Sequence, residues 1–98
     1  MDAETPPPER SVRKVVTIAN KRGLHARAAA RFVKVSAGFD AEISVAKGDI
    51  IVSGLSIMGL MMLAAWPGTE IEIRAVGPQA VLAIAALEAL IANKFDEE

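Results

Sequence analysis

Alternation of apolar and polar residues marks three segments of the chain as half-buried strands. These segments are 12–19, 41–46 and 70–75, and a short apolar run at 50–52 follows the second. Successive side chains of a strand point to opposite faces, so this alternation predicts one face against a core and one facing water. Turn residues at 47–49 separate the second strand from the apolar run, which predicts a hairpin. The pattern therefore predicts a four-stranded antiparallel sheet with one covered face.

Three other segments carry apolar residues at helical spacing. They are 24–37, 56–65 and a final stretch that opens after residues 77–78. The predicted order is β-α-β-β-α-β-α. This order is typical of an α+β domain built as an open-faced sandwich, with three helices on one face of the sheet.

The helical spacing also predicts which residues face the core. For the last helix, the expected core stripe is Ala80, Ala83, Ile84, Leu87, Leu90 and Ile91. For the first helix, the expected buried face is Ala26, Ala29, Ala30, Val33 and Ala37. The three basic residues of that helix, Arg27, Arg31 and Lys34, are expected on a different face.

Length and composition limit the organisation of the chain to one domain. It has 98 residues, of which 52% are hydrophobic and 23% charged, so its body is expected to be globular. Residues 1–11 are acidic and rich in proline, and we expect them to form a disordered tail. Residues 12–98 then form the single domain. The apolar stretch 55–66 is too short to cross a bilayer, so we expect a soluble, cytoplasmic protein without membrane insertion.

Charge and rare residues exclude several classes of function. Eleven Lys and Arg against twelve Asp and Glu give a net charge of −1, which argues against a general nucleic-acid binder. The chain has no cysteine and one histidine, so we expect no disulfide, no metal site and no cofactor. Glycine-rich nucleotide motifs and the H-E-x-x-H zinc motif are absent from the sequence.

His25 is the strongest candidate for chemistry. It follows Gly23 and stands in the first turn of an expected helix. Free backbone N–H groups and the positive end of the helix dipole meet there, which favours a neutral, nucleophilic imidazole and a bound phosphoryl group. Arg27 would offer further donors to the same oxygens. Two plainer interpretations stay open: His25 as an ordinary surface residue, and the basic residues as a solvated face.

The helix expected at 56–65 has a surplus of apolar residues. Leu60, Leu63 and Ala64 share one arc, which is enough to reach the core. A second arc of Ile57, Met58 and Met61 indicates either a contact surface, for which methionine is well suited, or a helix buried on several sides. Ser56 is the expected N-cap, and its hydroxyl is also a candidate for phosphorylation.

Two short motifs together resemble the histidine-containing phosphocarrier family, HPr. They are Gly-Leu-His-Ala-Arg at 23–27 and Ser-Ile-Met-Gly at 56–59. The likeness extends from about residue 12 to the last helix, and segments 17–25, 38–42 and 77–79 look closer to the nitrogen-related branch. The resemblance implies an HPr-like fold and a phosphocarrier that is not itself a turnover enzyme.

The resemblance also implies roles for individual residues and partners. His25 would accept a phosphoryl group from enzyme I, with phosphoenolpyruvate as the ultimate donor, and pass it to a IIA-type acceptor. Arg27 would stabilise that group, and Ser56 matches a serine modified by a dedicated HPr kinase/phosphorylase in some bacteria. The implied partner-binding surface consists of Ala30, Arg31, Lys34, Ile57, Met58 and Met61. The chain is expected to be a monomer.

One residue departs from the family pattern. Ala28 stands where the family usually has proline, directly after the His-Ala-Arg motif. Alanine is a strong helix former, so the helix is expected to persist, while the backbone N–H that position 28 regains is expected to shift phosphate affinity slightly. Two alternatives stay open: a small regulatory or ligand-binding domain in which His25 is incidental, and a protein-interaction module that is never phosphorylated.

Overall fold

The computed structural model describes residues 11–97, so residues 1–10 of the tail expected at 1–11 lie outside the described residues. The elements follow the predicted order, with a short 3-10 turn, η2, added after the last helix. They are β1 (Ser11–Thr17), α1 (Ala26–Ser36), β2 (Glu42–Lys47), β3 (Ile50–Ser53), α2 (Ile57–Met62), β4 (Glu70–Val76), α3 (Ala80–Ala92) and η2 (Lys94–Asp96). Ser11, which the sequence placed in the tail, is the first residue of β1.

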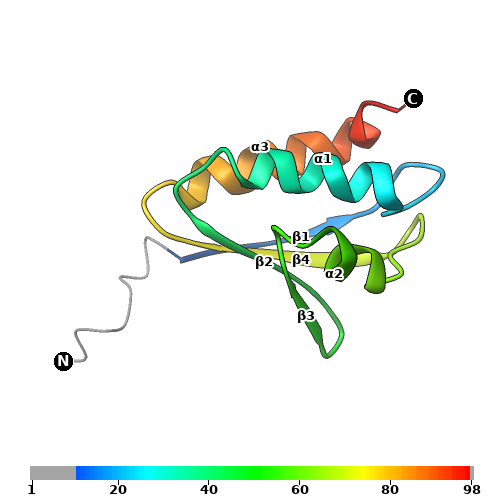
Figure 1. Cartoon of the computed structure of the whole chain (residues 1–98), viewed down its shortest axis with the longest axis horizontal. Coiled ribbons are helices and arrows are strands. Elements are labelled where there is room, and N and C mark those ends of the chain that lie inside the picture. Colours follow the sequence, from blue (N-terminus) through cyan, green and yellow to red (C-terminus); the bar gives the residue numbers. More distant parts are fainter. Residues whose placement is uncertain (1–10, 98) are drawn as a thin grey trace.

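The four strands form one antiparallel sheet in the order β1-β4-β2-β3. Alternation in β4 is as predicted, because Ile71, Ile73 and Ala75 are buried and the residues between them are less buried. In β2 the alternation is interrupted, because the neighbours Val45 and Ala46 are both buried. Figure 1 shows α1 and α3 side by side along the sheet, and α2 packs against α1 and β3. The α+β architecture predicted from the pattern is confirmed.

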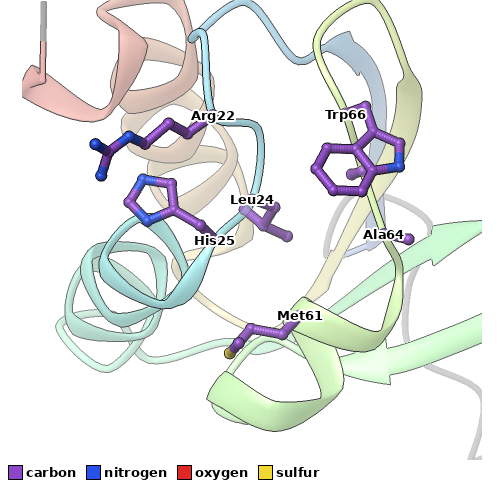
Figure 2. Close-up of a pocket in the computed structure, with 7 residues that line it drawn as sticks. Arg22, Leu24, His25, Met61, Ala64 and Trp66 are labelled. Atoms are coloured by element: carbon purple, nitrogen blue, oxygen red, sulfur yellow. The ribbon is translucent and has the colours of Figure 1, made fainter.

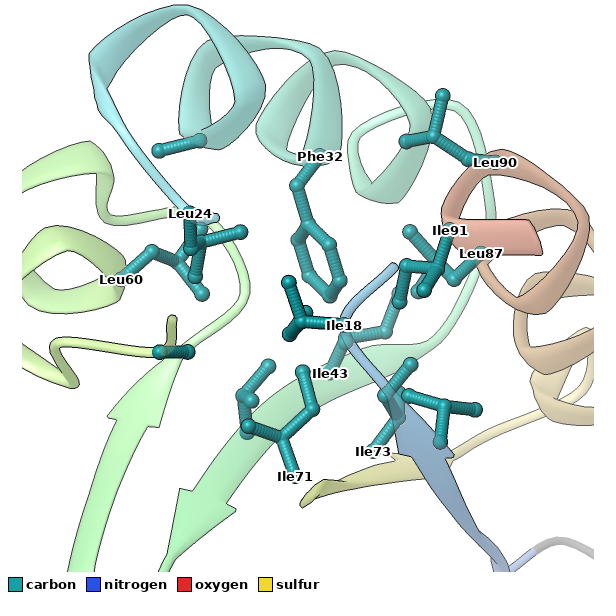
Figure 3. Packing of buried hydrophobic residues seen from close by; sticks show 14 of the residues in the cluster. Ile18, Leu24, Phe32, Ile43, Leu60, Ile71, Ile73, Leu87, Leu90 and Ile91 are labelled. Carbon is teal, nitrogen blue, oxygen red and sulfur yellow. The ribbon is translucent and has the colours of Figure 1, made fainter. Parts of the chain in front are cut away.

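The core lies between the sheet and the helices, and all three helices contribute to it (Figure 3). Phe32 of α1, Leu60 of α2 and Leu87 of α3 are completely buried in one cluster with Ile73 of the sheet. The core stripe predicted for α3 is confirmed at every position, because each of its six residues is buried. Within residues 11–97, the longest helix has 13 residues and none is suited to crossing a membrane.

The buried face predicted for α1 is wrong at most positions. Ala26, Ala30 and Ala37 are exposed, and Val33 is half-buried. The residues that are buried are Ala28, Ala29, Phe32 and Ser36. A run of alanines has the same apolar character on every side, so the one large side chain, Phe32, determines which face turns to the core.

Helix α2 is shorter than predicted. It ends at Met62, and Ala64, which the sequence placed on the core arc, is exposed with a backbone φ of 50°. Leu60 and Leu63 are buried as expected. The left-handed residue at position 64 turns the chain away from the helix axis and leads it past the loop that carries His25.

Candidate functional site

A tight loop between β1 and α1 positions the candidate histidine. Gly23 has a φ of 66°, a conformation that glycine adopts without steric cost. Its N–H donates to the carbonyl of Asn20 at 3.2 Å, and the N–H of Leu24 donates to the carbonyl of Ala65 at 3.0 Å. The buried side chain of Leu24 anchors this loop, so that His25 is presented at the start of α1.

His25 is the N-cap residue of α1, and its two ring nitrogens have different surroundings. Nδ1 accepts a hydrogen bond from the backbone N–H of Arg27 at 3.3 Å, while the backbone carbonyl of His25 accepts from Ala29 at 2.8 Å. Nδ1 therefore faces the free N–H groups at the positive end of the helix. The side chain is 24% exposed, so the ring is held in place and still reachable.

The other ring nitrogen, Nε2, lies 2.5 Å from Oε2 of Glu97, which comes from the segment after η2. Oε1 of Glu97 accepts from Nδ2 of Asn20 at 2.9 Å, and the same Nδ2 donates to the carbonyl of Gly23 at 2.8 Å. Partial burial raises the pKa of Glu97, but hydrogen bonds from Asn20 and His25 and the nearby positive charges outweigh it and lower that pKa. Glu97 is therefore a carboxylate at neutral pH.

Two hollows lie beside this histidine. One, of about 340 Å³, is polar and basic and is lined by Lys21, Arg22, Arg27 and Glu97. The other, of about 260 Å³, is mostly apolar, and Figure 2 shows His25 at its wall opposite Trp66, with Met61 below. Arg22 borders both hollows. The site thus combines a cationic hollow that suits an anion with an apolar one that suits a protein side chain.

The apolar arc predicted on α2 is exposed. Ile57, Met58 and Met61 are 40%, 70% and 40% exposed, and Met61 lines the same hollow as His25. Sequence reasoning missed three further exposed apolar residues around this helix: Leu55, Met62 and Trp66. Trp66 could have been suspected, because a tryptophan next to Pro67 and Gly68 in a turn has few ways to become buried.

The residues of α1 expected at the rim of this surface behave differently from one another. Arg27, Ala30 and Lys34 are exposed. Arg31 is half-buried, and its guanidinium donates a hydrogen bond to the backbone carbonyl of Phe95. Arg31 therefore ties α1 to η2 and is not a freely solvated cation of the rim.

Ser56 caps α2 as predicted, because its Oγ accepts from the N–H of Gly59 at 2.9 Å. Sequence reasoning missed Asn20, Arg22 and Glu97. Asn20 could have been found as a polar residue in the loop before Gly23, but no local pattern connects Glu97 with His25. In the described part of the chain, no three histidine or acidic side chains are grouped as metal ligands would be.

Comparison with known proteins gives consistent matches. The family described as "PTS HPr component phosphorylation site" matches residues 12–93. The phosphocarrier protein HPr of Pseudomonas putida is 49% identical over 83 residues, 84% of this chain and 92% of that protein. The phosphocarrier protein NPr of Escherichia coli (strain K12) is 38% identical over 89 residues, 90% of this chain and 99% of that protein. The crystal structure of HPr-C-His from Thermoanaerobacter tengcongensis is similar with a TM-score of 0.85 and 41% identity, covering 89% of this chain and 98% of that one.

Proposed function

Because the chain belongs to the HPr family of phosphocarrier proteins, we propose that His25 accepts a phosphoryl group from enzyme I and passes it to a IIA-type acceptor. Matches to relatives named NPr as well as HPr are consistent with a nitrogen-type, regulatory phosphotransferase system. The observation that carries the proposal is the position of Nδ1, which faces the N–H of Arg27 at the start of α1.

Transfer requires a nucleophile and groups that neutralise charge, and both are present at this loop. The lone pair on Nδ1 forms the new bond to phosphorus while the bond from phosphorus to the donor breaks. The phosphoryl oxygens then meet backbone N–H groups of the first turn of α1, including the N–H of Ala28 that the usual proline lacks. Arg27 borders the basic hollow and adds charged donors. The chain acts as an intermediate between two transferases and needs no cofactor.

The exposed apolar arc of Ile57, Met58 and Met61 is the proposed docking surface for both partners. It adjoins His25 through the hollow that Met61 lines, and exposed Lys34 and Arg27 provide a basic edge. An apolar centre gives residence time, whereas charges at the edge accelerate encounter with a partner whose own edge is acidic. We propose that the protein works as a monomer in the cytoplasm, where soluble partners reach this surface.

Ser56 is proposed as a regulatory phosphorylation site for an HPr kinase/phosphorylase. The added negative charge would sit at the start of α2, which tolerates it, beside the docking surface, which does not. Phosphorylation of Ser56 is therefore expected to slow transfer to His25 without unfolding the protein.

Labelling decides between a carrier and a protein-interaction module. The purified chain is incubated with enzyme I and radiolabelled phosphoenolpyruvate, and acid-labile phosphate on the protein is measured over time. We expect rapid labelling of the wild type, none of His25→Ala, and about tenfold slower labelling of Arg27→Ala. Lys14→Ala is the matched control, because it removes an exposed cation from β1. Undiminished labelling of His25→Ala would refute the proposal, and an unlabelled wild type would favour the interaction module.

A further inference from the structure

Glu97 lies at the candidate site, and the phosphocarrier proposal leaves it without a role. We propose that Glu97, oriented by Asn20, is a positioning residue that keeps the proton of the neutral His25 ring on Nε2. This leaves the lone pair of Nδ1 free to attack phosphorus, so the inference rests on the function proposed for His25. Glu97 and His25 are 72 positions apart in the sequence, and the fold brings them together.

The contacts fix both ends of the Glu97 carboxylate. Oε2 lies 2.5 Å from Nε2 of His25, and Oε1 accepts from Nδ2 of Asn20 at 2.9 Å. Asn20 is completely buried, and its Nδ2 lies between two acceptors, Glu97 and the carbonyl of Gly23. Rotating the amide would place its oxygen against both acceptors, so its orientation is determined. With Oε1 held by Asn20, the carboxylate directs Oε2 toward the ring.

The segment that carries Glu97 has an unfavourable backbone conformation, and strong packing holds it in place. Lys94, Phe95 and Asp96 have φ values of 56°, 55° and 61°, a left-handed conformation that costs about 1–2 kcal/mol per residue. The fully buried side chain of Phe95 and the hydrogen bond from Arg31 to its carbonyl keep this turn in place. Backbone strain that persists only because its surroundings impose it is typical of functional sites.

Proton placement follows from these contacts. A neutral imidazole has one proton, and a carboxylate at Nε2 favours having it there as a donor. Nδ1 already accepts a hydrogen bond from the backbone N–H of Arg27, so a ring proton placed on Nδ1 would be repelled by that donor. When Nδ1 bonds to phosphorus and the donor bond breaks, the ring keeps its Nε2 proton and becomes positively charged. Glu97 stabilises that charge, as the aspartate of a hydrolase triad stabilises the charged form of its histidine. The reverse step returns the ring to its neutral form.

Glu97→Gln tests this role sharply. Since Asn20 donates to the side-chain oxygen at position 97, the glutamine oxygen takes the place of Oε1 and its NH₂ faces Nε2. That NH₂ is a donor, which favours moving the ring proton to Nδ1. Nitrogen-15 NMR of the unphosphorylated protein reports the protonated nitrogen directly. We expect Nε2–H in the wild type, a shift toward Nδ1–H in Glu97→Gln, and at least tenfold slower labelling by enzyme I.

Glu88→Gln is the matched control, because it removes the same charge from α3, where Glu88 pairs with Lys14 at 3.4 Å. It should keep the wild-type ring spectrum and labelling rate, and thermal melting verifies that both variants are folded. Identical ring spectra in the wild type and Glu97→Gln, with normal labelling of both, would overturn the role of Glu97 alone. A wild type that enzyme I does not label would overturn the function proposed for His25 instead.

Discussion

Replacing Gly23 by alanine should be the most damaging single-methyl change in the loop that carries His25. A Cβ at this position would collide with the carbonyl oxygen of Ala65 and lie 3.1 Å from Cα of Trp66. That carbonyl accepts a hydrogen bond from the N–H of Leu24, so a shift that relieves the collision breaks this hydrogen bond, which is worth about 1 kcal/mol. The left-handed backbone adds about 1–2 kcal/mol and overpacking against backbone about 1–3 kcal/mol. We expect a total loss of about 3–6 kcal/mol.

Gly48 offers a matched control for this change. Its φ of 58° is similar to the 66° of Gly23, but a Cβ there would meet nothing within 4 Å. Gly48→Ala should therefore cost only the backbone penalty of about 1–2 kcal/mol. Urea unfolding of both variants gives the difference, expected at about 2–4 kcal/mol. Equal losses of unfolding free energy at the two positions would show that the contact with Ala65 relaxes without cost, which would refute the steric penalty assigned to Gly23→Ala.

Three further perturbations test other parts of the site. Met58→Glu should slow labelling by enzyme I at least tenfold. Val81→Glu, at a site 62% exposed on α3, should not slow it, and equal labelling rates of the two variants would show that α2 is not part of the docking surface. Ser56→Ala should lower the unfolding free energy by about 1 kcal/mol by removing the cap, while Ser56→Asp should keep the cap and slow labelling; a normal rate would leave Ser56 as a cap only. Because folding lowers the pKa of Glu97, its carboxylate adds to the free energy of unfolding at pH values above its ordinary pKa, and this contribution is lost as pH falls through the lowered pKa. Urea titrations should therefore show the unfolding free energies of wild type and Glu97→Gln converging in acid. A difference that stays constant with pH would contradict this.

Sequence alone was sufficient where one face of an element differs clearly from the other. The alternation of β4 and the large apolar residues of α3 identify their buried faces without ambiguity, and both were predicted correctly. The alanine-rich start of α1 has no such contrast, and there the predicted face was wrong. The length of α2 was also missed, because the left-handed Ala64 has no signal in its residue type.

The site was predictable only in its local part. The order Gly23, His25, Arg27 places a ring at a helix start by short-range rules, and the N-cap geometry of His25 agrees with them. The contacts of Asn20 and Glu97 depend on the fold bringing two ends of the chain together. Such a long-range contact between a buried amide and a carboxylate has no period in the sequence to reveal it.

The strand order has a consequence for how quickly the protein reaches its folded state. β4 is the last strand in the chain, but it lies in the middle of the sheet between β1 and β2. The hairpin of β2 and β3 can form early from local contacts, whereas β1 has no backbone partner until β4 arrives. Closing long loops is slow, so the rate-limiting event is expected to be the insertion of β4. A nascent chain that lacks β4 therefore has an incomplete sheet, and the proposed docking surface is assembled only near the end of synthesis.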